Sequence, residues 1–159
     1  MLSPGMKRRL AFDVISEGWN TYTCPGDLVF KIRPLLMRAW TTAEPGTKGN
    51  CDIFLDQHQL MVALPMETPI ETNIVDPTSF SEAEGMAKES VEILSRDEVW
   101  NVYQLPELGL RLKAQYSVNS LMKVIGGIDM HGEQMYIMEG ETIIKPADEP
   151  APPPSNSKA

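Results

Sequence analysis

The chain has 159 residues, which is enough for one compact domain or for two very small ones. Its composition, 42% hydrophobic and 23% charged, is typical of a soluble globular protein, and no apolar run reaches the roughly 20 residues that a membrane-spanning helix needs. The net charge of −8 disfavours general affinity for nucleic acid, which requires a concentrated basic surface.

The N-terminal segment, residues 1–11, is expected to be a flexible lead-in, because residues 3–5 (SPG) break any early element. The basic residues 7–9 are not followed by an apolar stretch, so a secretory signal peptide is not predicted. Two cysteines, Cys24 and Cys51, are too few for a disulfide framework. Reduced thiols of this kind favour a cytoplasmic protein.

A short motif then occurs twice in the chain. Residues 19–25 (WNTYTCP) and residues 100–106 (WNVYQLP) are identical at four of seven positions, including two of the three tryptophans. Each copy leads into an alternating basic and apolar segment, residues 30–33 (FKIR) and residues 110–113 (LRLK). Self-similarity at a fixed offset is typical of a repeated structural unit. We therefore expect two related units.

The similarity extends to the later part of each unit, where residues 53–56 (IFLD) match residues 136–139 (YIME). A competing alignment pairs residues 56–58 with residues 129–131 and superposes the two histidines, but it requires a deletion and matches fewer apolar positions. We prefer the first alignment, in which the histidines are not equivalent.

Two local signals concern the strands of the first unit. Pro34 interrupts an apolar stretch, and because a proline cannot donate to a strand ladder, it predicts an edge position or a bulge. Residues 53–55 and 60–64 are expected to form a hairpin across the polar residues 56–59.

The segment between the units, residues 71–97, departs from the strand pattern. Residues 81–84 (SEAE) match a capping box, and apolar residues follow at helical spacing, which predicts a linker with a helix over about residues 81–95. The tail, residues 147–159, is rich in proline and has no apolar content to bury, so it is expected to be disordered.

These segments together predict a mainly β protein. Two tandem related antiparallel β units, residues 12–70 and 98–146, are expected to pack as a pseudo-twofold barrel or sandwich with one bridging α-helix. A parallel βαβ arrangement is disfavoured because only one helical segment is present.

The alternating segments carry the best candidate for a shared binding site. Side chains alternate across a strand, so Lys31 and Arg33 share one face, as do Arg111 and Lys113 in the second unit. Such cations suit a phosphate or carboxylate partner. The simpler alternative is a solvated face, or ion pairs with neighbouring strands.

Trp19 and Trp100, which begin the repeated motif, are further candidates for a ligand or partner site. Exposed indoles would offer stacking platforms for a base, a sugar or a proline-rich peptide, whereas buried ones would anchor the core. Core packing is the interpretation that the usual burial of aromatic rings favours.

A metal site would have to use Asp56, His58, Asp129 and His131, with Glu133 nearby. Structural zinc sites generally have four nitrogen or sulfur ligands, and catalytic ones have three and a water, so this set is weak and no cofactor is expected. The sequence also contains no nucleophile elbow and no phosphate-binding loop. Enzymatic activity is therefore less expected than binding.

The sequence favours a non-catalytic binding or assembly protein, an accessory or structural component of a larger complex. Its ten methionines suit adaptable apolar surfaces, and we expect a protein partner or self-association, with no membrane partner. The first alternative is a polyanion- or nucleic-acid-binding β module that uses the basic strand face. The second alternative is a metal-dependent enzyme.

Overall fold

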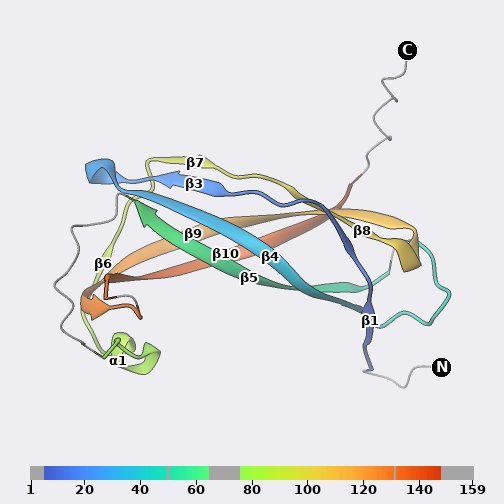
Figure 1. Ribbon diagram of the computed structural model, residues 1–159, viewed down its shortest axis with the longest axis horizontal. Coiled ribbons are helices and arrows are strands. Elements are labelled where there is room, and N and C mark those ends of the chain that lie inside the picture. Colours follow the sequence, from blue (N-terminus) through green and yellow to red (C-terminus); the bar gives the residue numbers. More distant parts are fainter. Residues whose placement is uncertain (1–5, 50, 65–75, 131, 148–159) are drawn as a thin grey trace, which may run out of the picture.

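The computed structural model describes residues 6–49, 51–64, 76–130 and 132–147 (Figure 1). Its elements are β1 (Arg8–Leu10), β2 (Asp13–Ser16), β3 (Asn20–Thr23), η1 (Pro25–Asp27), β4 (Val29–Thr41), β5 (Ile53–Leu64), α1 (Phe80–Glu84), β6 (Lys88–Ser90), β7 (Ser95–Asp97), β8 (Asn101–Leu105), η2 (Pro106–Leu108), β9 (Leu110–Ile128) and β10 (Gln134–Pro146). The protein is mainly β, as predicted. Within the described ranges, none of the helices has the length and apolar character to cross a membrane.

The first sheet is organised around β4. β5 pairs antiparallel with β4 along one side, while β3 pairs with the first residues of the other side and β1 with the last. β7 adds to the outer side of β3. Pro34 lies at the level of the gap between β3 and β1, where β4 has a strand on one side only. A residue without an N–H is tolerated there.

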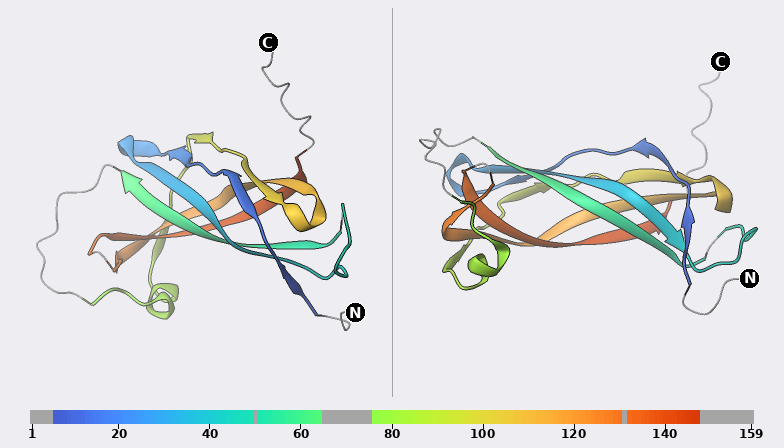
Figure 2. Two further views of the ribbon diagram at one scale, coloured as in Figure 1. Left: turned by 45° about the vertical axis from the view of Figure 1, so that its right-hand side comes forward. Right: turned by 60° about the horizontal axis from the view of Figure 1, so that its bottom comes forward.

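The second sheet is organised around β9 by the same series of pairings. β10 lies along one side, β8 and β6 share the other side, and β2 adds to the outer side of β8. The chain thus exchanges strands between the sheets. β2 follows β1 but joins the second sheet, and β7 follows β6 but joins the first. Figure 2 shows the two long hairpins, β4–β5 and β9–β10, crossing at an angle.

No closed barrel is found in the described residues. β5 pairs there only with β4, and β10 only with β9, so each sheet keeps an open edge. The hairpin expected across residues 56–59 is wrong, because β5 runs unbroken from Ile53 to Leu64. A hydrogen bond from the Thr142 hydroxyl to Gln57 Oε1 (3.2 Å) joins the two edge strands.

Alternate apolar side chains of both sheets fill the space between them. Phe30 of β4 meets Tyr136 of β10 edge-on, with ring centroids 4.8 Å apart. The buried members of the core clusters are Tyr22, Cys24, Phe30, Ile32, Tyr116, Val118 and Leu121; Leu10, Ala39, Leu105, Leu108 and Leu112; and Leu36, Tyr103 and Ala114. Each cluster draws on both sheets, so neither sheet buries its apolar face without the other.

Two fully buried asparagines hold the segments that cross between the sheets. Asn20 Oδ1 accepts a hydrogen bond from the Val99 N–H (2.8 Å). Asn101 Oδ1 accepts one from the Gly18 N–H (2.9 Å). Each asparagine therefore binds a backbone N–H in the other segment that crosses between the sheets. Leaving such an N–H without a hydrogen bond would cost about 1–3 kcal/mol.

Two tyrosine–glutamate pairs accompany the asparagines. The Tyr22 hydroxyl donates to Glu98 (2.6 Å), and the Tyr103 hydroxyl donates to Glu17 (2.7 Å). Burial of the phenols, together with these hydrogen bonds, raises the pKa of both tyrosines far above the ordinary value. The hydroxyls stay protonated and act as fixed donors between the sheets.

The N-terminal lead-in is more ordered than expected. Residues 8–10 form β1, in which Leu10 is buried against the core. Arg8 Nη1 lies 2.9 Å from Glu107 Oε2, which ties β1 to the turn after β8. The prediction of a flexible segment over residues 1–11 is therefore wrong for β1, because β4 is long enough to leave a place for it. The predicted disordered tail lies outside the described residues, except for Ala147.

The bridging helix expected over residues 81–95 is also wrong. α1 ends at Glu84, and its capping box is formed by Ser79 and Glu82. Gly85 ends the helix, and the chain then supplies β6 to β9 and β7 to β3. These pairings give hydrogen-bond partners to backbone N–H and C=O groups of β9 and β3. That gain outweighs the weak helix propensity of the segment.

Candidate binding surfaces

The two repeated tryptophans lie outside the core, contrary to the favoured interpretation. Trp19 is 37% exposed, and Trp100 is half-buried. Cations cover both indoles. The Arg33 guanidinium lies 5.9 Å from the centroid of the Trp19 ring, and Lys113 Nζ lies 4.7 Å from that of Trp100. The aromatic and the basic candidates therefore belong to the same surfaces.

The outer face of the second sheet carries a pair of like charges. Lys113 on β9 lies directly opposite Lys145 on β10, and Lys145 Nζ is also 5.6 Å from the Trp100 ring centroid. Neither lysine has an ion-pair partner among the described residues. Like charges in directly opposed positions destabilise a sheet unless an anion or an aromatic face compensates them. Lys145 joins the site only through this pairing, and the sequence pattern missed it.

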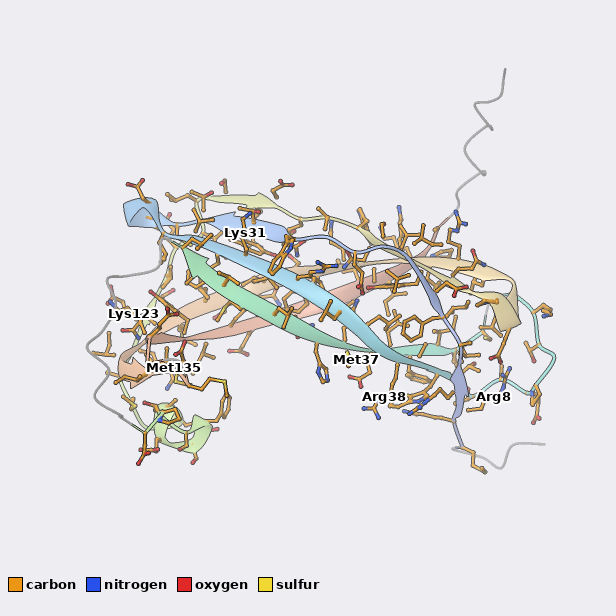
Figure 3. All side chains as sticks on the ribbon, viewed as in Figure 1. Arg8, Lys31, Met37, Arg38, Lys123 and Met135 are labelled. Carbon is orange, nitrogen blue, oxygen red and sulfur yellow. The ribbon has the colours of Figure 1, made fainter. Side chains whose placement is uncertain are left out.

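The other cations of the predicted face are placed differently. Lys31 is exposed on β4, on the outer face of the first sheet (Figure 3). Arg33 is turned against Trp19, and its Nε is buried without a hydrogen-bond partner in the described residues. Arg111 Nε donates to Gln104 (3.1 Å). The four predicted cations thus lie on two different sheets and do not form one basic face.

The ladders also revise the alignment of the basic segments. Lys31 lies between Thr21 and Val62 in the first sheet, and Lys113 lies between Val102 and Lys145 in the second. Lys31 and Lys113 therefore hold the same place in their ladders. Two residues further along, the position of Arg33 in the first sheet is occupied by Gln115 in the second. Only one of the two predicted cations is therefore common to both sheets.

The open edge of the first sheet is apolar. Along β5, Phe54, Leu60, Met61 and Val62 are exposed, and Leu60 is 47% accessible to solvent. Leu60 and Val62 lie on the outer face of the sheet, and Met61 lies on the opposite face. The only acidic residue of β5 is Asp56, whose Oδ2 binds Arg38 at 2.7 Å.

The open edge of the second sheet has a different character. β10 contains Glu139, Glu141 and Lys145, and it ends in Pro146. The register shift between Glu139 and Gly140 corresponds to the one between Asp56 and Gln57 in the first sheet, so it does not distinguish the two edges. Ile143 and Ile144 are exposed, but they lie within this charged and irregular strand. Charge and proline are features that prevent an edge strand from pairing with another chain.

The weak metal candidates are not assembled in the described part of the chain. Asp56 is bound by Arg38, and His58 Nε2 lies 3.9 Å from Asp56 Oδ1. Asp129 accepts a hydrogen bond from the Glu133 N–H (2.9 Å) in the turn before β10. His131 lies outside the described residues. Among the residues that are described, no group of three or more His, Cys, Asp or Glu side chains could hold a metal.

The two cysteines are free. Cys24 is buried, and this burial raises the pKa of its thiol. Cys51 Sγ lies 3.4 Å from the Thr41 hydroxyl. Both properties of Cys24 disfavour reaction of that thiol with molecules in solvent.

Comparison of the chain with protein-family models, with curated proteins and with solved structures finds no match. Two surfaces of the described residues have distinctive chemistry. One is the apolar β5 edge, formed by Leu60, Met61 and Val62. The other is the Trp100 surface, formed by Trp100, Lys113 and Lys145.

Proposed function

We propose that this chain is a non-catalytic binding or assembly protein, acting as an accessory or structural component of a larger complex. The observation that carries the proposal is the β5 edge. Its backbone groups face outward without a strand partner in the described residues, and apolar side chains are exposed on both of its faces. Such an edge is a template for pairing with another strand.

Proteins that must avoid such pairing protect their edges. β10 carries Glu139, Glu141, Lys145 and a terminal proline, whereas β5 has one acidic residue, and that residue is neutralised by Arg38. An unprotected edge beside a protected one is difficult to explain by stability alone, because both edges face the same solvent. The difference supports a binding role for β5.

In this proposal the scaffold is a duplicated strand unit, packed as a pseudo-twofold sandwich with exchanged strands. Two correspondences support it. The Trp-Asn motif precedes β3 and β8, which pair with β4 and β9 in the same way. The register shift between Leu36 and Arg38 in β4 has its counterpart between Val118 and Ser120 in β9. After duplication, one edge would have kept its protection and the other would have become a binding surface.

The proposal is tested by asking whether association depends on β5. Leu60→Lys places a charge on the β5 edge, and Ile143→Lys places one at the same position of the β10 ladder, opposite Gln115. Native mass spectrometry and pull-down from cell extract should detect an assembly with the natural sequence and with Ile143→Lys, but not with Leu60→Lys. A monomer that captures no partner and turns over a substrate would contradict the proposal.

The Trp100 surface supports a second candidate function, the binding of polyanions. The specific observation is that Lys113 and Lys145 lie opposite each other over Trp100, with no acidic partner among the described residues, so that a bound phosphate chain would reduce their repulsion. Binding of polyphosphate, measured by calorimetry, should weaken steeply as salt increases. Lys113→Gln and Lys145→Gln should each weaken it, whereas Lys31→Gln in the first sheet should not. No binding at low salt, or equal loss with Lys31→Gln, would remove this candidate.

A further inference from the structure

We propose that β5 of one copy pairs antiparallel with β5 of a second copy, about a twofold axis at Met61. The two first sheets then form one continuous sheet across a dimer. This inference rests on the proposed role of the β5 edge in binding and specifies its occupant.

The edge is complementary to itself in this register. With Met61 opposite the partner's Met61, Leu60 lies opposite the partner's Val62, and His58 lies opposite the partner's Leu64. Exposed apolar side chains therefore cover one another on both faces of the joined sheet. An axis at His58, Gln59 or Leu60 would bring Asp56 opposite Leu60, Val62 or Leu64 of the second copy. Centring the pair on Met61 leaves that carboxylate outside the paired segment.

The β4–β5 hairpin differs in charge from the chain as a whole. The chain carries a net charge of −8, which opposes association of two copies. β4 and β5 together contain three cations, Lys31, Arg33 and Arg38, and one acid, Asp56, giving +2, so the rest of the chain carries −10. The β9–β10 hairpin carries the same +2, from Arg111, Lys113, Lys123 and Lys145 against Glu139 and Glu141, so the choice of β5 rests on its exposed apolar side chains.

The protected β10 edge explains why assembly would stop at a dimer. A twofold contact uses the same edge on both copies and therefore closes. Continued growth would need a second unprotected edge, but β10 carries Glu139, Glu141, Lys145 and Pro146, and the edge strands β2 and β7 have only four and three residues. A twofold contact through β5 therefore predicts a discrete species and not a fibre.

Sedimentation of the purified full chain over a range of concentrations tests the dimer. The natural sequence and Ile143→Lys should sediment with twice the monomer mass, and Leu60→Lys should sediment as a monomer. Circular dichroism and thermal melting establish that both variants are folded. A dimer that persists in folded Leu60→Lys overturns the inference.

Cysteine cross-linking tests the register. Opposed positions of antiparallel strands lie within the distance that a disulfide spans. Met61→Cys should form a covalent dimer on oxidation, whereas Ile144→Cys, at the same place in the β10 ladder opposite Ala114, should remain monomeric on a denaturing gel. The natural sequence, with Cys24 and Cys51, gives the background. Equal cross-linking of both variants, or none, rejects the proposed axis.

The outcomes also separate this inference from the proposed function. If the purified chain is monomeric at every concentration, while capture of another protein still depends on Leu60, the self-pairing is wrong and the binding role of β5 stands. If neither self-association nor capture depends on Leu60, both fail.

Discussion

The two sheets are built by the same pairings, yet their open edges differ. In the first sheet, the edge residue that pairs with Lys31 is Val62. In the second sheet, the edge residue that pairs with Lys113 is Lys145. One edge is therefore apolar where the other is basic. The interior needs both sheets equally, because every core cluster is shared. The comparison separates residues that hold the fold together from residues that distinguish one surface from the other.

The largest expected effect comes from truncating a core side chain in either sheet, because both sheets share the core. Phe30 lies opposite Tyr22 in its ladder, and Leu112 lies opposite Tyr103. Phe30→Ala should cost about 3–5 kcal/mol and Leu112→Ala about 2–5 kcal/mol of unfolding free energy. Urea unfolding should remain a single transition in both variants. A second transition in either variant would show that the sheets unfold separately.

A smaller effect is expected at the two crossing asparagines, where the halves are not equal. Asn20 also donates from Nδ2 to the Tyr116 carbonyl (2.7 Å), while Nδ2 of Asn101 is buried without a partner in the described residues. Asn20→Ala and Asn101→Ala should each cost about 1–3 kcal/mol by orphaning a buried N–H, with Asn20→Ala the more costly. The free energy of unfolding in urea measures both. Equal losses would contradict the asymmetry.

The smallest effect appears only at alkaline pH. Because the pKa of Tyr22 and Tyr103 is raised in the folded state, the folded chain holds protons that the unfolded chain releases above pH about 10. Stability is therefore intact below that pH and falls as pH rises, by up to about 1.4 kcal/mol per pH unit for each tyrosine. Tyr22→Phe and Tyr103→Phe should flatten the dependence of melting temperature on pH between 9 and 12. An unchanged slope in the double variant is the contrary result.

The sequence predicted the parts of this fold that are local. Alternating apolar residues indicated antiparallel strands, and the repeated Trp-Asn motif lies at the start of β3 and β8. Residues 53–56 and 136–139 were also aligned as the ladders align them, since Asp56 pairs at Arg38 and Glu139 at Ser120. These signals depend on neighbours along the chain, which the sequence displays directly.

Non-local features were missed or misplaced. The segment expected to be helical, residues 81–95, has helical spacing, but residues 88–90 pair with β9 and residues 95–97 pair with β3. Lys145 became part of a candidate site only through its register with Lys113. The exposure of Leu60 depends on which strand lies at the edge of its sheet. Each of these outcomes is decided by strand order, which a single sequence does not reveal.

Hydrogen–deuterium exchange of β5 and β10 at low and high protein concentration is the most direct test that β5 is the assembly edge. Pairing with a second copy would protect backbone amides of residues 58–64 as concentration rises, while those of residues 139–145 on β10 would be unaffected. Concentration-dependent protection confined to β5 is the predicted result. Protection that is equal on both edges, or that does not change with concentration in either, would contradict the account.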